Sequence, residues 1–230
     1  MAASVLQAHI LEDARKVLGD PTAVEIPIIA RRYPAISKIS VSKFAGSSNP
    51  DDYITFEICS LLDDNIHDRL LYKAKRPGFN QLILIKFVRR YSIKLHSFCA
   101  KAGHAPSILG YERLPGGWFA VAMEYIEPGI TITKSNLRTS NKVRWIKELA
   151  RLVTNFHAKN LVHGDLRDEN IICKGDSVML VDFDWGGEVG EASYPRLGLS
   201  PELLEDRASS DLRITKDDDV RVLGKTLNKL

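Results

Sequence analysis

Residues 163–170 read His-Gly-Asp-Leu-Arg-Asp-Glu-Asn, and residues 182–184 read Asp-Phe-Asp. Asp165 and Asn170 are five residues apart, so a single loop can present both side chains, and Asp182 follows a short apolar run. Phosphoryl transfer needs a carboxylate that orients the attacking hydroxyl, an amide oxygen on one metal ion, and a second carboxylate between metal ions and phosphates. Asp165, Asn170 and Asp182 offer these groups in that order, so the sequence predicts a phosphoryl-transfer site.

The order of the two motifs resembles that of the protein-kinase superfamily, in which H-R-D-x-x-x-x-N precedes D-F-G. Two later segments extend the resemblance: residues 200–202, Ser-Pro-Glu, are similar to A-P-E, and residues 219–224, Asp-Val-Arg-Val-Leu-Gly, are similar to D-V-W-S-L-G. In kinases the first residue of that last motif braces the catalytic-loop backbone, and the resemblance implies this role for Asp219. An ordered set of matches indicates a kinase-like fold far more strongly than one loop does.

The resemblance also implies a role for each polar residue of the site. Asp165 would orient the acceptor hydroxyl, and Arg167 would stabilise charge on the transferred phosphoryl group. Asn170 and Asp182 would hold Mg²⁺, and ATP would be the phosphoryl donor. Protein-serine/threonine kinases usually carry a Lys at the position of Arg167, so a cation is retained there.

Two positions depart from the kinase pattern. Gly164 replaces the Arg that commonly reads an activation-loop phosphate, so we do not expect regulation by such a phosphate. Asp184 replaces the Gly of D-F-G, and we expect a stiffer turn that is less able to flip inward, because only Gly tolerates positive φ freely. The letters H-G-D are also common in small-molecule kinases that resemble aminoglycoside and choline phosphotransferases.

The residues around the loop have the periodicities that such a fold requires. Residues 143–159 carry apolar side chains at spacings of three and four, which predicts an amphipathic helix ending just before the loop. Short apolar runs at 161–162, 171–173 and 178–181 predict strands that flank the loop. The expected fold class is α+β, a two-lobed protein-kinase-like fold with a small, mainly antiparallel β N-lobe and a shortened, mainly helical C-lobe.

Residues 82–88, Leu-Ile-Leu-Ile-Lys-Phe-Val, form an apolar run with one embedded cation, Lys86. A Lys within a strand can simply lie on the solvent face. The run resembles V-A-I-K, however, so we expect Lys86 to bind the α- and β-phosphates. Residues 70–75 should pair with this strand through a Pro-Gly turn.

Two kinase elements are missing near this strand. Residues 87–111 contain no Asp or Glu, so the helix expected at 92–103 offers no acidic partner for Lys86; Glu57, Glu112 or the bound phosphates are the alternatives. No G-x-G-x-x-G loop occurs, and Gly46, in Gly-Ser-Ser, is the nearest candidate for contact with phosphates, although a plain flexible loop explains it as well.

Residues 118–126 resemble the last N-lobe strand and the start of a hinge. The backbone groups of Glu124 and Ile126 would then bind adenine. Met123 would lie at the back of the adenine pocket, although a Met in an apolar strand is more often part of the core.

The predicted organisation has four parts: a helical extension at 1–37, an N-lobe at 38–123, a hinge at 124–129 and a minimal or truncated C-lobe at 130–230. The 230 residues contain three cysteines, far apart and without metal-ligand spacing, so we expect an intracellular protein of the cytoplasm or nucleus, or of a host cell if it is an effector. The apolar runs are too short to predict a membrane span, and the net charge of +3 does not imply nucleic-acid binding.

Residues 89–104 are rich in Arg, Lys and His. The basic side chains can form a solvated face or a docking surface for an acidic partner.

Three functions remain open. The first is an ATP- and Mg²⁺-dependent protein serine/threonine kinase with a protein substrate, and the second is a small-molecule kinase of the aminoglycoside or choline type. The third is a pseudokinase that acts by binding, which the missing acidic partner and glycine loop favour. Residues 86–91, 105–112 and 114–118 are also similar to fungal kinase-like domains, including those of Crinkler-type effectors.

Overall fold

The computed structural model describes residues 34, 36–41, 52–62, 70–127, 130–134, 139–174, 177–207 and 211–230. Contacts divide the chain into two units: the first comprises Met1–Arg89 and Leu109–Met123, and the second comprises Arg90–Ile108 and Glu124–Leu230. We expected all of 38–123 in one lobe, whereas the contacts group Arg90–Ile108 with the second unit. Nearly all of the predicted extension at 1–37, and residues 128–129 of the predicted hinge, lie outside the described residues.

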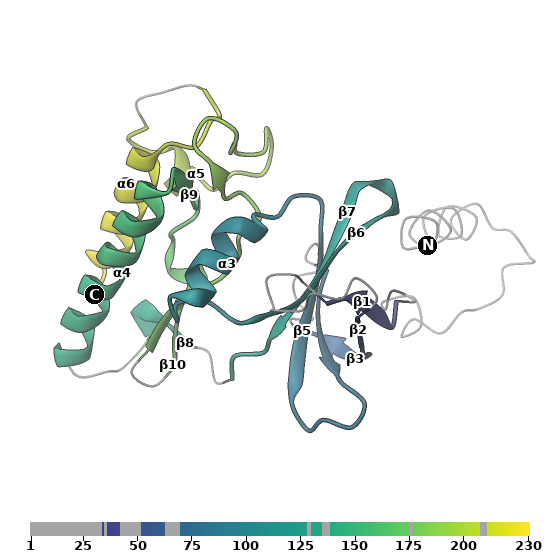
Figure 1. Cartoon of the computed structure of the whole chain (residues 1–230). Helices are drawn as coiled ribbons and strands as arrows, with labels where there is room; N and C mark the ends of the chain where they lie inside the picture. The colour runs from purple at the N-terminus through teal and green to yellow at the C-terminus, as the bar shows by residue number, and fades with distance from the viewer. Residues whose placement is uncertain are drawn as a thin grey trace, which may run out of the picture. The chain divides into compact units, whose positions relative to one another are not determined.

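A five-stranded sheet forms the centre of the first unit, with the order β3-β4-β5-β7-β6 (Figure 1). Its β4 strand pairs antiparallel with both β3 and β5, as the sequence predicted for the hairpin before Lys86. A second sheet pairs β1 with β2, and a bridge from Val41 to Gly110 links this region to β6. The strands are β1 (Lys38–Ser40), β2 (Tyr53–Thr55), β3 (Glu57–Leu61), β4 (Leu71–Lys75), β5 (Leu82–Val88), β6 (Ile108–Leu114) and β7 (Trp118–Glu124).

The alternation of side chains along β5 determines which way Lys86 faces. Ile83, Ile85 and Phe87 are buried in the core of the first unit. Since successive residues of a strand point to opposite faces of the sheet, Lys86 lies on the face opposite to these three side chains, and it is half-buried there.

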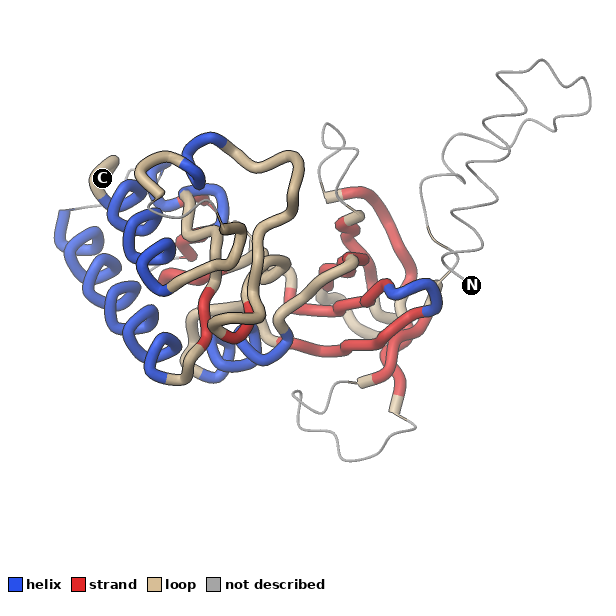
Figure 2. The backbone as a smooth tube through the Cα atoms, turned by 90° about the horizontal axis from the view of Figure 1, so that it is seen from above, coloured by secondary structure: helices blue, strands red, loops and turns tan. Residues whose placement is uncertain are grey.

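Helices dominate the second unit (Figure 2). The long helix α4 buries Trp145, Leu149, Leu152, Val153 and Phe156, so the predicted amphipathic helix is confirmed. The short sheets have the orders β11-β10-β8 and β12-β9. The elements are α3 (Ile93–Lys101), β8 (Ile130–Thr131), α4 (Thr139–Ala158), β9 (Leu161–Val162), β10 (Ile171–Lys174), β11 (Ser177–Leu180), β12 (Gly187–Glu188), α5 (Pro201–Leu204) and α6 (Lys216–Leu227).

Caps define where α3 and α6 begin. Ser92 Oγ accepts the N–H of Leu95 at the start of α3. Thr215 and Asp218 form a reciprocal capping box at the start of α6. The negative charges of the three Asp residues in that first turn interact favourably with the positive end of the helix dipole and stabilise the helix. Among the described residues, no helix is both long and apolar enough to cross a membrane.

Candidate active site

The predicted catalytic loop connects β9 to β10 and is largely buried. Asp165 is 5% exposed and Asn170 is 2% exposed. Strands β9 and β10 form where the short apolar runs predicted them, at Leu161–Val162 and Ile171–Lys174. The two polar side chains are therefore fixed by buried strands at both ends of the loop.

Asp219 braces the loop backbone, as the resemblance implied. Its carboxylate is fully buried and accepts the N–H of His163 at 2.9 Å and the N–H of Gly164 at 2.7 Å. His157 Nε2 lies 3.0 Å from the same carboxylate. An aspartate at the start of α6 thus satisfies two backbone donors that are 56 and 55 residues away along the chain.

Gly164 has a structural reason to be glycine. Its φ is +85°, and a Cβ at this position would lie 2.6 Å from Ile214 Cδ1. An Arg here would be strained and would displace a buried side chain. The departure from H-R-D therefore reflects close packing of the segment before α6 against the loop.

Asp165 and Arg167 form a two-point ion pair. Arg167 Nε donates to Asp165 Oδ1 at 2.6 Å, and Nη2 donates to Oδ2 at 2.9 Å. The hydrogen bond from Arg167 to Asp165 raises the pKa of the guanidinium above its usual range. Arg167 therefore orients the predicted catalytic carboxylate, while its contact with a phosphoryl group stays a prediction.

Asn170 is oriented by its own loop. Its Nδ2 donates to the carbonyl of Asp165 at 3.0 Å, which leaves Oδ1 as the atom that can bind a metal ion. Asp182 has a φ of +64°, which is uncommon for a residue other than glycine and tends to occur at functional sites. The N–H of Val181 donates to the carbonyl of Asn170 at 3.0 Å, so Asp182 follows a residue that is bound to the loop of Asp165 and Asn170.

These side chains fit Mg²⁺ bound together with a nucleotide. In the described part of the chain, no three His, Cys, Asp or Glu side chains converge into a metal centre of their own. Mg²⁺ is commonly bound through one or two protein oxygen ligands together with substrate phosphates. Asn170 Oδ1 and the Asp182 carboxylate offer oxygen atoms of this kind, and their binding of Mg²⁺ stays a prediction.

Phe183 contacts two imidazoles. Its ring stacks on His96 with a centroid distance of 4.5 Å, and the ring of His163 meets it at a tilt, with a centroid distance of 5.2 Å. Its carbonyl accepts the N–H of Ser92 at 2.9 Å. The α3 helix is thus anchored directly to the Asp-Phe-Asp motif.

The left-handed residue of this motif is Asp182, not Asp184. We expected the side chain of Asp184 to stiffen the turn because Gly alone tolerates positive φ. That reason does not apply, since the backbone at Asp184 does not adopt positive φ.

The predicted nucleotide-binding residues are divided between the two units. Lys86 and Met123 belong to the first unit, and Met123 is 6% exposed in its core-facing strand. Glu124 and Ile126 belong to the second unit. The N–H of Glu124 donates to the carbonyl of Ser107 at 2.9 Å, so its carbonyl is the group that can bind adenine. Gly46 lies outside the described residues.

The expected acidic partners of Lys86 have contacts of their own or face solvent. Glu112 accepts the N–H of Ser40 at 2.9 Å and its hydroxyl at 3.1 Å. Glu57 is exposed on β3, opposite Lys75. Lys86 itself takes part in an interaction within the molecule. Its binding to phosphates stays a prediction.

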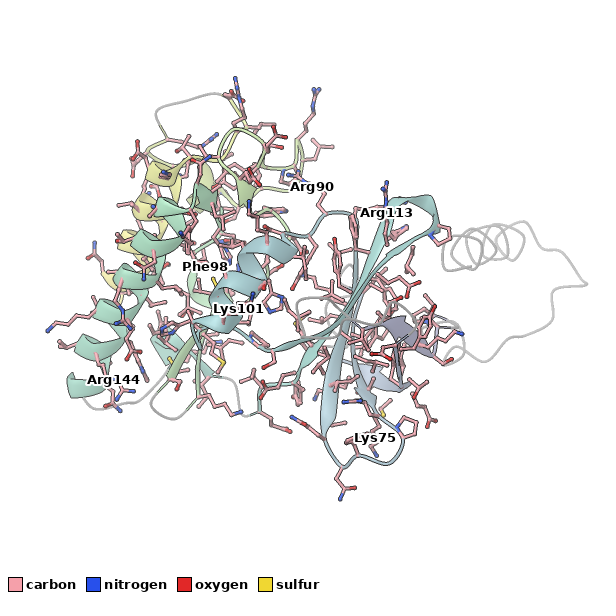
Figure 3. The ribbon with its side chains drawn as sticks, in the orientation of Figure 1. Lys75, Arg90, Phe98, Lys101, Arg113 and Arg144 are labelled. Carbon is pink, nitrogen blue, oxygen red and sulfur yellow. The ribbon has the colours of Figure 1, made fainter. Side chains whose placement is uncertain are left out.

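Several basic side chains of residues 89–104 are used within the molecule. Arg89 lies 4.3 Å from the Trp118 ring, Lys94 pairs with Glu188 at 2.7 Å, and His104 Nδ1 lies 2.9 Å from the carbonyl of Val178. Lys101 is exposed at the end of α3 (Figure 3). Docking of an acidic partner on this segment stays a prediction.

Comparison with known proteins supports the fold. No protein-family model matches the chain. The chain is 30% identical over 71 residues to a putative serine/threonine-protein kinase of Acanthamoeba polyphaga mimivirus, a match that covers 29% of this chain and 13% of that protein. It is similar in structure to the kinase PK-1 of Cydia pomonella granulovirus, with a TM-score of 0.60 and 18% identity over 76% of this chain and 67% of that one.

The similarity to Crinkler-type effectors is not shown by these matches and stays a prediction. The predicted fold class is confirmed: the chain has the two-lobed α+β fold of the protein kinases.

Proposed function

We propose that this protein is a phosphotransferase that moves the γ-phosphoryl group of ATP, with Mg²⁺, to a Ser or Thr hydroxyl of a protein. The observation that carries the proposal is the Asp165 carboxylate, which is buried, ion-paired to Arg167 and placed by a braced loop. A carboxylate held in this way can accept the hydrogen bond of an incoming hydroxyl without first reorganising.

Each residue of the site would act on a different part of the reaction. Asp165 would orient the acceptor hydroxyl and receive its proton as the new O–P bond forms and ADP leaves. The Arg167 guanidinium would stabilise the negative charge of the transferred phosphoryl group in the transition state. Lys86 would bind the α- and β-phosphates, and the Glu124 carbonyl and the Ile126 backbone would bind adenine.

Asn170 and Asp182 would hold Mg²⁺, which neutralises phosphate charge when it is bound. The Asp182 carboxylate carries the only full negative charge of this ligand pair. The next residue, Phe183, has ring contacts with His96 and His163.

A small-molecule kinase is the second candidate. Gly164 supports it, because H-G-D in place of H-R-D is also common in small-molecule kinases. Residues 200–202 favour a protein substrate, since they resemble the A-P-E that closes a peptide-docking segment.

The test is the transfer of label from γ-labelled ATP to a protein mixture and to a panel of amino sugars and amino alcohols, with and without Mg²⁺. We expect Mg²⁺-dependent label on protein Ser or Thr with the parent, strongly reduced label with Asp182→Asn, and parent-level label with the exposed control Asp217→Asn. Label on metabolites alone would favour the second candidate. No transfer, together with no thermal stabilisation by millimolar ATP, would favour a protein that acts by binding.

A further inference from the structure

Tyr194 connects the segment between Asp184 and α5 to the catalytic loop. The side chain is 2% exposed, and its hydroxyl donates to the carbonyl of Gly164 at 2.8 Å. The two residues are 30 positions apart. A buried phenol that hydrogen-bonds to a backbone carbonyl fixes both groups, because neither can exchange its partner for water.

This contact completes the restraint of the peptide group before Asp165. The carbonyl of this group, on Gly164, accepts from Tyr194, and its N–H, on Asp165, donates to His163 Nδ1 at 3.3 Å. The preceding N–H, on Gly164, donates to Asp219 at 2.7 Å. On the other side, the carbonyl of Asp165 accepts from Asn170 Nδ2 at 3.0 Å. Each of the two peptide groups that flank Asp165 is therefore held by a buried side chain, Asn170 from the same loop and Tyr194 from a distant segment.

The Tyr194 ring is itself held on two sides. The Arg207 guanidinium lies over it at 5.1 Å, and Trp185 meets it edge-on at 5.8 Å. Arg207 also donates to both oxygens of Asp218, at 2.8 and 3.2 Å, and Asp218 is 4% exposed. The backbone N–H of Tyr194 donates to Leu212 at 2.8 Å. The hydroxyl is thus presented by a rigid support rather than by a loose loop.

We propose that Tyr194 is a positioning residue, whose hydroxyl sets the peptide group between Gly164 and Asp165 and through it the direction of the Asp165 carboxylate. This inference rests on the proposed phosphotransferase function and adds to it a residue that neither touches nucleotide nor binds metal. The loop has Gly instead of Arg at position 164, and the Tyr194 hydroxyl connects this loop to the segment between Asp184 and α5. Burial raises the pKa of the Tyr194 hydroxyl, so it remains a hydrogen-bond donor at ordinary pH.

The variant Tyr194→Phe isolates the hydroxyl, because it keeps the ring and its contacts with Arg207 and Trp185. Tyr53→Phe is the matched control, since Tyr53 is 49% exposed in the first unit. For Tyr194→Phe we expect a fall in kcat of about tenfold, the size of one lost hydrogen bond felt in the transition state, with KM for ATP unchanged. Tyr53→Phe should match the parent in both constants.

A second measurement does not depend on activity. Amide hydrogen exchange of a peptide covering residues 161–170 should be faster in Tyr194→Phe than in the parent and unchanged in Tyr53→Phe. Unchanged exchange in Tyr194→Phe would overturn the proposal even if the parent transfers no phosphate, a result that would count separately against the proposed function.

The two readouts also separate positioning from general destabilisation. A parent kcat in Tyr194→Phe would overturn the positioning role. A loss of ATP binding and of thermal stability in equal measure, with no selective effect on kcat, would assign Tyr194 to the core instead.

Discussion

The predicted catalytic loop of the second unit and the Lys86 strand of the first unit hold their polar side chains in different ways. Around Asp165, the loop backbone is bound by Asp219 and Tyr194, both far away in the sequence. Lys86 lies on a regular strand, and its direction follows from simple alternation with Ile85 and Phe87. The helix α3, which has no acidic residue, is anchored to Phe183 in the second unit.

This difference indicates how the two regions should respond to change. The catalytic loop is assembled by buried contacts before any ligand arrives, so its substitutions should alter stability or the rate of transfer. The Lys86 strand is held by its buried side chains Ile83, Ile85 and Phe87, so substitution of Lys86 should alter nucleotide binding and leave the strand intact.

Among substitutions that affect nucleotide binding, we expect the largest effect at Lys86. Replacing it by Met removes a charged donor to phosphate, and we expect the dissociation constant of ATP to rise about ten- to a hundredfold. Titration with ATP measures this, and Lys75→Met, at the exposed end of β4, is the matched control. Equal affinities for parent and Lys86→Met would remove Lys86 from the nucleotide site and break the comparison.

Gly164 tests how tightly the catalytic loop is packed. Gly164→Ala places a Cβ 2.6 Å from Ile214 Cδ1 at a φ of +85°, and we expect a loss of about 1–3 kcal/mol in the free energy of unfolding. Ile214→Val removes that δ-methyl group, so Gly164→Ala should cost less in this background.

Gly224→Ala is the control for the same substitution, because nothing lies within 4 Å of a Cβ there. This helical position should be slightly stabilised, by about 0.5–1 kcal/mol. Denaturant unfolding gives all of these values. If Gly164→Ala is as stable as the parent, the catalytic loop is not packed against Ile214 as tightly as the structure indicates.

The smallest expected effect is acid sensitivity at the support of Tyr194. Burial alone would raise the pKa of Asp218, but hydrogen bonds from Arg207, Thr215 and Arg221 outweigh it and lower that pKa to about 2. Since the folded pKa lies below the unfolded one, Asp218 stabilises the protein above about pH 4, and this contribution is lost as the pH falls toward 2.

Unfolding measured between about pH 4 and pH 2 should therefore depend less on pH in Asp218→Asn than in the parent. The exposed Asp217→Asn should keep the parent's dependence. Identical pH profiles for Asp218→Asn and the parent would show that this carboxylate is not held as the structure indicates.

Short-range patterns explain what could be predicted. The spacing of Asp165, Asn170 and Asp182 identified the loop, and apolar periodicity identified α4. The prediction placed the start of this helix at residue 143 instead of Thr139, because the first turn is polar and carries no apolar periodicity. Alternation identified β5. These features depend on residues that are neighbours in the sequence.

The remaining features depend on distant contacts. Tyr194 hydrogen-bonds across 30 residues, and Gly164 is packed by Ile214 from the segment before α6, so no local pattern marks either. The grouping of Arg90–Ile108 with the second unit follows from Ser92 and His96 meeting Phe183. The glycine of H-G-D was the one local signal, because glycine is favoured where the backbone adopts positive φ, and Gly164 has a φ of +85°.

The measurement that tests the central claim most directly is the rate of γ-phosphoryl transfer by Asp165→Asn at saturating ATP and Mg²⁺, alongside its ATP affinity. The substitution keeps the shape of the side chain and removes its charge. We expect ATP affinity close to that of the parent and a transfer rate lower by about 10²–10⁴-fold, the usual contribution of a positioned base. A variant that transfers phosphate as fast as the parent would contradict the assignment of the catalytic loop.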